Sequence, residues 1–243
     1  MQPFLIALQF LTSLPVHLSD IPQPQAVGRS MLYYPLVGLL LGTILWLVSV
    51  VLGDAAHPMQ AALLLAVWVS LTGGLHLDGL ADSADAWLGG FGDRERTLAI
   101  MKDPRSGPIA VVVLVLLLLL KFVALWTLLA QGDQLVLLLA PLLGRSALLG
   151  LFLTTPYVRP GGLGQAVADH LPRAQLRVVL TLVIALCLAL GTSGWLALAV
   201  SVGIGLLARR AMCRRIGGTT GDTAGALLEL VECGVLVALA LQA

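Results

Sequence analysis

Charged residues are scarce in this 243-residue sequence, in which 11% of the residues are charged and 58% are hydrophobic. A typical soluble domain has about 25% charged and about 45–50% apolar residues, so this chain carries more apolar surface than a water-soluble fold can bury. The apolar runs also lack the alternating pattern of a membrane β-barrel strand. Because lipid offers the backbone no hydrogen bonds, we predict an all-α, polytopic bundle of membrane helices.

Other features that the sequence lacks exclude further classes. The three cysteines are scattered, and their spacing fits neither a zinc site nor a disulfide framework. The net charge is +1 and there is no basic tract, so no nucleic acid partner is expected. The first 15 residues lack a basic segment and a clear cleavage site. We therefore expect a short interfacial or re-entrant helix ending near Pro15 rather than a signal peptide.

Seven stretches are long and apolar enough to be membrane spans, each of which needs about 20 residues. Two of them, the fifth and sixth, are short and are separated by the turn at 191–194. The whole chain, 1–243, is thus expected to be one integral-membrane domain of about seven transmembrane helices. The expected spans are 31–53, 59–74, 109–130, 135–153, 176–190, 195–208 and 224–241.

Lysine and arginine residues orient these spans, since cytoplasmic loops carry an excess of both. With seven spans, every basic loop falls on one side, whereas the opposite loops at 54–58, 131–134 and 191–194 have no Lys or Arg. We therefore expect a bacterial cytoplasmic (inner) membrane protein whose N-terminus and active site are cytoplasmic and whose C-terminus is outside. The basic loop residues are Arg29, Arg94, Arg96, Lys102, Arg105, Arg159, Arg173, Arg177, Arg209, Arg210, Arg214 and Arg215.

An acidic stripe opens the long polar segment at 73–108. Asp78, Asp82 and Asp85 are spaced i, i+4, i+7, so on a helix they share one face. Like charges at this spacing repel one another, and a divalent cation reverses that effect. Because carboxylates are preferred ligands of Mg²⁺, which commonly bridges them to substrate phosphates, the stripe predicts a Mg²⁺ site. The alternative is a solvated acidic helix beside the membrane.

Residues around this stripe are candidates for binding substrate. His76 is either a substrate contact or an ordinary solvated or packed histidine. Lys102 and Arg105 are suited to bind phosphate. Asp103 could serve as a further metal ligand or as a proton acceptor. The alternative for this proline-containing segment is an interfacial loop that only follows the distribution of positive charge.

Ionisable residues also occur later in the chain and inside the predicted spans. Asp222, in a glycine-rich turn, is either a phosphate-linked residue or a helix N-cap. Glu229 shares its helical face, and such groups within a span are functional candidates. Arg145 could contact substrate, or it could form a purely structural ion pair with an acidic residue. Lys121 could be a structural partner or extend to the interface. Arg159 lies in a loop that is either a substrate lid or a connector.

Together these segments resemble the adenosylcobinamide-GDP ribazoletransferase (cobalamin 5'-phosphate synthase) family. The resemblance runs through nearly the whole chain in the same order. The segments that carry it are Phe10–Pro15, Tyr34–Gly38, Gly73–Asp85, Met101–Asp103 with Gly107, and Gly221–Asp222 with Gly225, Ala226 and Glu229.

The resemblance implies a Mg²⁺-dependent membrane enzyme in the last assembly stage of coenzyme B12. Such an enzyme joins adenosylcobinamide-GDP to α-ribazole, or to its 5'-phosphate, and releases GMP. Its expected partners besides these substrates are the lipid bilayer, other late enzymes of the pathway and a second copy of the chain. For this reaction we expect the metal at Asp78, Asp82 and Asp85, catalytic roles for Asp82, Asp103 and Glu229, and substrate contacts from His76, Lys102, Arg105, Arg145, Arg159 and Asp222.

Two other functions are weaker matches. CDP-alcohol phosphatidyltransferases also use Asp-rich motifs, and Asp82 and Asp85 have the first spacing of that motif. However, Ala86 replaces its next glycine and Gly107 stands where its last aspartate would fall. An ion-coupled transporter would more often contain paired half-domains, and the sequence contains no evident internal repeat.

Overall fold

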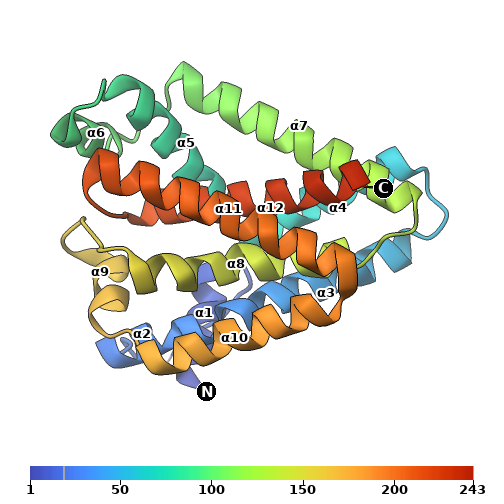
Figure 1. Cartoon of the computed structure of the whole chain (residues 1–243), viewed down its shortest axis with the longest axis horizontal. Coiled ribbons are helices and arrows are strands. Elements are labelled where there is room, and N and C mark those ends of the chain that lie inside the picture. The colour runs from blue at the N-terminus through green and yellow to red at the C-terminus, as the bar shows by residue number, and fades with distance from the viewer. Residues whose placement is uncertain (19, 243) are drawn as a thin grey trace.

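Helices are the regular elements throughout the part of the chain that the structure describes, residues 1–18 and 20–242 of a computed structural model (Figure 1). This confirms the predicted all-α class. One isolated bridge joins Tyr157 to Thr219. The helices are α1 (Gln2–Leu11), α2 (Pro24–Ser30), the short 3₁₀ helix η1 (Met31–Tyr33), α3 (Tyr34–Leu52), α4 (His57–Thr72), α5 (Leu75–Gly89), α6 (Arg94–Ile100), α7 (Pro108–Ala130), α8 (Val136–Thr154), α9 (Gly162–Asp169), α10 (Arg173–Ala189), α11 (Gly191–Ile216) and α12 (Gly221–Gln242).

Each of the seven predicted spans coincides with a helix, but fewer satisfy a strict test of length and hydropathy. Five described helical segments satisfy it, and α4 and α5, bent by 87°, could form a sixth. Helix α10 has 17 residues and begins with the polar sequence Arg-Ala-Gln. The prediction of about seven spans is therefore approximate. The expected N-terminal helix is present as α1, and its interfacial location stays a prediction.

The bend between α4 and α5 positions the acidic stripe. Gly73 and Gly74 both have positive φ, at 61° and 69°, a conformation that glycine adopts without steric cost. Helix α4 ends there and α5 leaves at 87°. Because α5 turns away and carries three aspartates, we treat it as part of the polar end of the bundle and not as a span. The aspartate stripe therefore runs across this end of the molecule.

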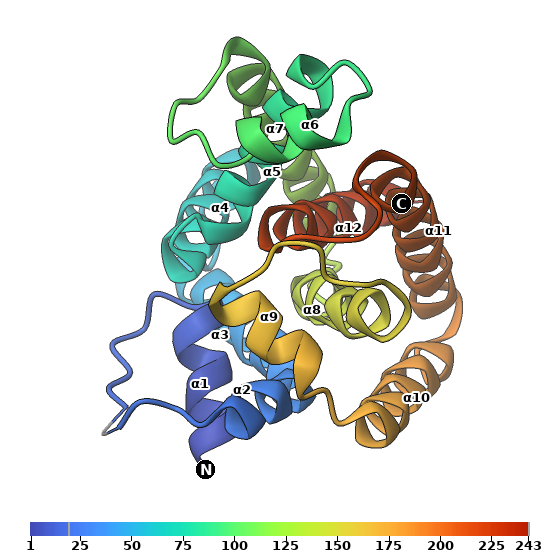
Figure 2. The same cartoon turned by 90° about the vertical axis from the view of Figure 1, so that its left-hand side faces the viewer.

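Helices α8 and α12 form the centre of the bundle, surrounded by the other long helices (Figure 2). In the most apolar window of each helix, 72% of α8 and 67% of α12 is buried, against 28% of α7 and 17% of α11. Helices α7 and α11 thus expose most of their apolar surface, as lipid-facing helices do. The ionisable groups in the middle of these two helices, Arg145 of α8 and Glu229 and Glu232 of α12, are consequently enclosed by protein.

Helices α3 and α8 approach closely because glycines of α3 face the backbone of α8. A Cβ atom added at Gly42 would lie 2.6 Å from the carbonyl oxygen of Leu137, and one at Gly38 would lie 2.5 Å from that of Pro141. Small residues let membrane helices approach in this way, and van der Waals packing then stabilises the pair.

We expect Gly42→Ala to lower the free energy of unfolding by about 1–3 kcal/mol, the usual cost of overpacking, because α3 and α8 must move apart. Thermal unfolding of the purified protein in detergent measures this change. Gly203→Ala on α11 is the matched control, because a Cβ there has no neighbour within 4 Å. Equal melting temperatures for the two variants would contradict the assigned close contact.

Candidate active site

The acidic helix α5 meets the first turn of α12 at the polar end of the bundle. A Cβ at Gly79 would lie 2.8 Å from the carbonyl oxygen of Asp222, and one at Gly225 would lie 3.3 Å from the Cα of His76. The contact at Gly79 thus leaves no room for a side chain, and the contact at Gly225 leaves little. This contact brings together two polar segments that are far apart in the sequence.

The carboxylates at this contact form a cluster of like charge, which we call the acidic face: Asp78, Asp82 and Asp222. Burial, followed by the negative charges of Asp78 and Asp222, raises the pKa of Asp82 to about 6. Arg159 partly offsets these charges, since its NH2 group lies 2.7 Å from Oδ2 of Asp222. The same guanidinium group donates to the carbonyl oxygen of Met101 at 3.4 Å. Arg159 therefore connects the loop before α9 with the start of α12 and with the loop between α6 and α7.

Asp85 has a different partner from the other two aspartates of the stripe. Its carboxylate accepts hydrogen bonds from the backbone N–H groups of Gly107 and Ala110, the latter at 3.0 Å. It therefore caps the N-terminus of α7 from another helix and satisfies two N–H groups that have no partner within α7. A Cβ at Gly107 would lie 2.7 Å from Oδ1 of Asp85, which explains the glycine there.

The predicted three-aspartate metal site is consequently not assembled in advance. Within residues 1–18 and 20–242, no three His, Cys, Asp or Glu side chains are placed to hold a metal ion together. Asp78 and Asp82 still share the open side of α5, whereas the carboxylate of Asp85 is engaged by α7. Metal ligation by these residues stays a prediction.

Asp103 and Arg105 lie in the exposed loop between α6 and α7 and pair with each other. The Nε and NH2 groups of Arg105 donate to the two carboxylate oxygens of Asp103 at 2.9 and 2.7 Å. These bonds lower the pKa of Asp103 to about 2, and a proton acceptor works best with a pKa near the working pH. The geometry thus disfavours Asp103 as the base. Lys102 is exposed beside this pair.

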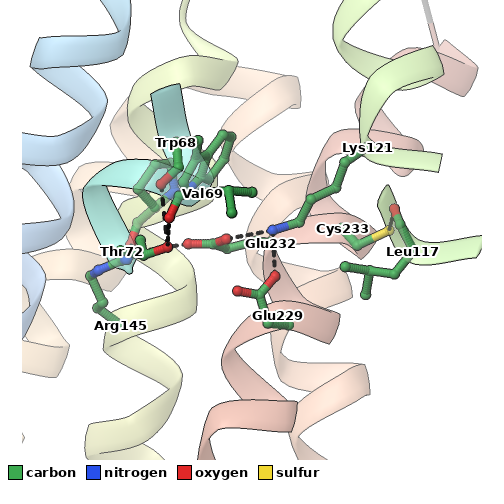
Figure 3. A network of polar contacts seen from close by, with 10 residues as sticks. Trp68, Val69, Thr72, Leu117, Lys121, Arg145, Glu229, Glu232 and Cys233 are labelled. Atoms are coloured by element: carbon green, nitrogen blue, oxygen red, sulfur yellow. Dashed lines mark hydrogen bonds and ion pairs between the residues drawn. The ribbon is translucent and has the colours of Figure 1, made fainter. Parts of the chain in front are cut away.

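A second group of charges lies within the spans (Figure 3). The Lys121 ammonium group donates to Oε2 of Glu229 at 2.6 Å and to Oε2 of Glu232 at 2.7 Å. NH1 of Arg145 donates to the other oxygen of Glu232 at 2.6 Å. All four side chains are at most 4% exposed. With two cations and two anions this buried quartet is neutral, which is what the low dielectric of a membrane interior requires.

The buried quartet changes the interpretation of two predicted site residues. Glu229, proposed as a proton acceptor, and Arg145, proposed as a phosphate contact, are both enclosed and paired. The geometry favours the structural alternative for each. It also shows that Lys121 is 2% exposed and lies 4.8 Å from the centre of the Trp68 ring, so it does not extend to the interface.

A cavity of about 220 Å³ lies beside the acidic face. Its lining includes His76, Asp78 and Asp222, together with Phe10 of α1 and Tyr34 of α3. Sequence reasoning gave Phe10 and Tyr34 no role in the site, although both lie in segments that carry the family resemblance. A larger cavity of about 280 Å³ between α8, α10 and α11 has apolar walls and contains none of the predicted site residues.

Comparisons with known proteins cover almost the whole chain. A family model described as cobalamin-5-phosphate synthase matches residues 3–240. The adenosylcobinamide-GDP ribazoletransferase of Stutzerimonas stutzeri (strain A1501) is 67% identical over 242 residues, covering 100% of this chain and 99% of the relative. That of Pseudomonas entomophila (strain L48) is 64% identical over 243 residues, covering 100% of both chains. No solved structure matches.

Neutrality of the buried quartet predicts how its variants behave. We expect Lys121→Met to lower the free energy of unfolding by about 3–5 kcal/mol, because it leaves an uncompensated buried carboxylate. The double variant Lys121→Met with Glu229→Gln restores neutrality and should recover most of this loss. Unfolding in detergent monitored by circular dichroism measures both. A double variant no more stable than Lys121→Met would contradict the pairing.

The cap on α7 predicts a difference between two aspartates of one stripe. Asp85→Ala should lower the free energy of unfolding by about 0.5–2 kcal/mol, the usual cost of losing a helix cap. Asp78→Ala should not destabilise the protein, because it relieves repulsion between like charges. Both variants are compared by thermal unfolding without added metal. If Asp78→Ala proved the more damaging of the two, the role assigned to Asp85 would be wrong.

Proposed function

The chain belongs to the cobalamin-5-phosphate synthase family, and from this membership we propose that it transfers the adenosylcobinamide phosphoryl group of adenosylcobinamide-GDP to α-ribazole or its 5'-phosphate, releasing GMP. The observation that carries the proposal is the match over residues 3–240, which includes every segment of the acidic face. The product is adenosylcobalamin or its 5'-phosphate, so the reaction belongs to a late step of coenzyme B12 biosynthesis.

The reaction is a phosphoryl transfer in which one P–O bond replaces another. A ribose hydroxyl oxygen of α-ribazole bonds to the cobinamide-linked phosphorus, and the bond from that phosphorus to the bridging oxygen breaks. GMP leaves with the electron pair, and the hydroxyl proton passes to a base. Transfers of this kind require mainly positioning and stabilisation of negative charge, so no covalent intermediate on the protein is needed.

The acidic face is suited to this task only if its negative charge is compensated when the pyrophosphate binds. Asp78 and Asp82 are the residues that we propose hold Mg²⁺, since Mg²⁺ is usually bound by one or two carboxylates plus substrate phosphates and water. Burial, followed by the negative charges of Asp78 and Asp222, raises the pKa of Asp82, and a cation bound here would offset both effects. When bound, Mg²⁺ would neutralise charge on the pyrophosphate and on the leaving GMP.

Protein groups other than the metal ligands orient the substrates. Arg159, 23% exposed and already bridging Asp222 and Met101, is placed to contact phosphate oxygens at the edge of the acidic face. Lys102 and Arg105 are exposed on the adjacent loop and could reach the same anion. Because the geometry disfavours Asp103 and Glu229, we propose that the hydroxyl proton passes to a carboxylate of the acidic face.

The chain is a multi-pass membrane protein, and we propose that the acidic face is cytoplasmic in the bacterial inner membrane. Basic residues occur in α6 and in the last turn of α11. Both of these segments lie at the same end of the bundle as α5, and the C-terminus lies at the other end (Figure 1). From the positive-inside rule we propose that the C-terminus is outside. At this membrane face both substrates would reach the site from the cytoplasm.

We expect the purified protein to release GMP from adenosylcobinamide-GDP when α-ribazole and Mg²⁺ are supplied, and to stop when the metal is chelated. Asp82→Asn should lower turnover at least about 100-fold, as when a key electrostatic contact is lost. Asp54→Asn, on the opposite loop, is the control and should be fully active. Full turnover by Asp82→Asn, or turnover that persists in excess chelator, would overturn the metal site.

A further inference from the structure

The cavity beside the acidic face, of about 220 Å³, has two chemically different parts. Most of its lining is apolar and comes from four helices: Phe10 of α1, Tyr34 of α3, Leu148 and Phe152 of α8, and Val167 of α9. The rings of Phe10 and Tyr34 stack, with centroids 6.2 Å apart and an interplanar angle of 27°. Asp78 and Asp222 line its polar part. An occupant would therefore place an apolar portion against these side chains and a polar portion against the carboxylates.

His76 is a polar group in the wall of this cavity with an unmet need for a hydrogen bond. It is 4% exposed, and neither ring nitrogen has a partner among the described residues. Buried polar atoms in native proteins are almost always hydrogen-bonded, so each exception requires an explanation. Gly225 packs against the Cα of His76 and holds it beside α12. Neither nitrogen is open to the cavity in this conformation, so a ligand would supply the missing partner once the imidazole ring turns towards it.

The size and chemistry of the cavity distinguish between the parts of the two substrates. Pockets for drug-sized ligands enclose about 300–1,000 Å³, so this smaller cavity suits one bicyclic aromatic group and excludes a corrin ring. Guanine has polar atoms along most of its edge, which the apolar wall would leave without partners. The base of α-ribazole is a dimethylbenzimidazole, with an apolar methylated edge and one free ring nitrogen.

We propose that this cavity binds the benzimidazole base of α-ribazole, with His76 as the hydrogen-bond partner of its free ring nitrogen. The methylated edge lies against Leu148 and Phe152, and the base packs on the aromatic side chains at Phe10 and Tyr34. The ribose then lies at the polar part, where its attacking hydroxyl faces the acidic face that receives the pyrophosphate. This inference rests on the proposed function and assigns the acceptor subsite within it.

Two kinds of substitution test this proposal. One fills the cavity, and the other removes the hydrogen bond to the base. Leu148→Phe should raise the KM for α-ribazole at least tenfold and leave the KM for adenosylcobinamide-GDP within twofold. His76→Phe should act in the same direction, and His76→Gln, which keeps a hydrogen-bonding group, should be affected less. Leu180→Phe is the matched control, because it introduces the same change in the larger cavity between α8, α10 and α11. It should leave both KM values unchanged.

Equilibrium dialysis of α-ribazole alone against the wild-type protein keeps failure of this inference separate from failure of the proposed function. Saturable binding that is lost in Leu148→Phe supports the subsite even where turnover is absent. An unchanged KM for α-ribazole in a folded Leu148→Phe variant overturns it, as does a rise confined to the KM for adenosylcobinamide-GDP. Val167→Phe, on the short helix α9, fills the same cavity if Leu148→Phe fails to fold.

Discussion

Neutralisation of charge inside the bilayer fixes the position of α12, and the polar end of the protein depends on that position. Lys121 of α7 and Arg145 of α8 compensate Glu229 and Glu232 of α12 at distances of 2.6–2.7 Å. An unpaired charge there would be costly, so the three helices are held in one register. The first turn of α12 is then directed to the polar end, where it presents Asp222 and a glycine surface to α5.

The three aspartates of α5 divide into two roles because α5 packs between α7 and α12. Asp85 faces α7 and caps it, whereas Asp78 and Asp82 face Asp222 across the acidic face. Glycines make this arrangement possible: Gly73 and Gly74 allow the 87° bend before α5, and Gly79 allows the contact with α12. The carboxylates that remain open for a cation are thus the ones beside the cavity.

The cap also explains why this chain departs from the motif of the CDP-alcohol phosphatidyltransferases. Gly107 stands where their last aspartate would fall, and here a Cβ atom at Gly107 would collide with the carboxylate of Asp85. A larger side chain at this position would displace the cap on α7. The local packing at this position therefore differs from what that motif would require.

The sequence by itself determined the helical class, the approximate spans and the grouping of basic residues at one end, because hydropathy and loop charge are properties of local segments. It also determined that Asp78 and Asp82 share a helical face. Tertiary structure alone decided that Asp222 joins them, that Asp85 caps α7 and that Glu229 pairs with Lys121. Pairing between side chains of different helices depends on which backbones approach closely, and spacing along one chain does not contain that information. For the same reason the aromatic wall of the cavity, built from α1, α3 and α8, emerged only when those helices were packed together.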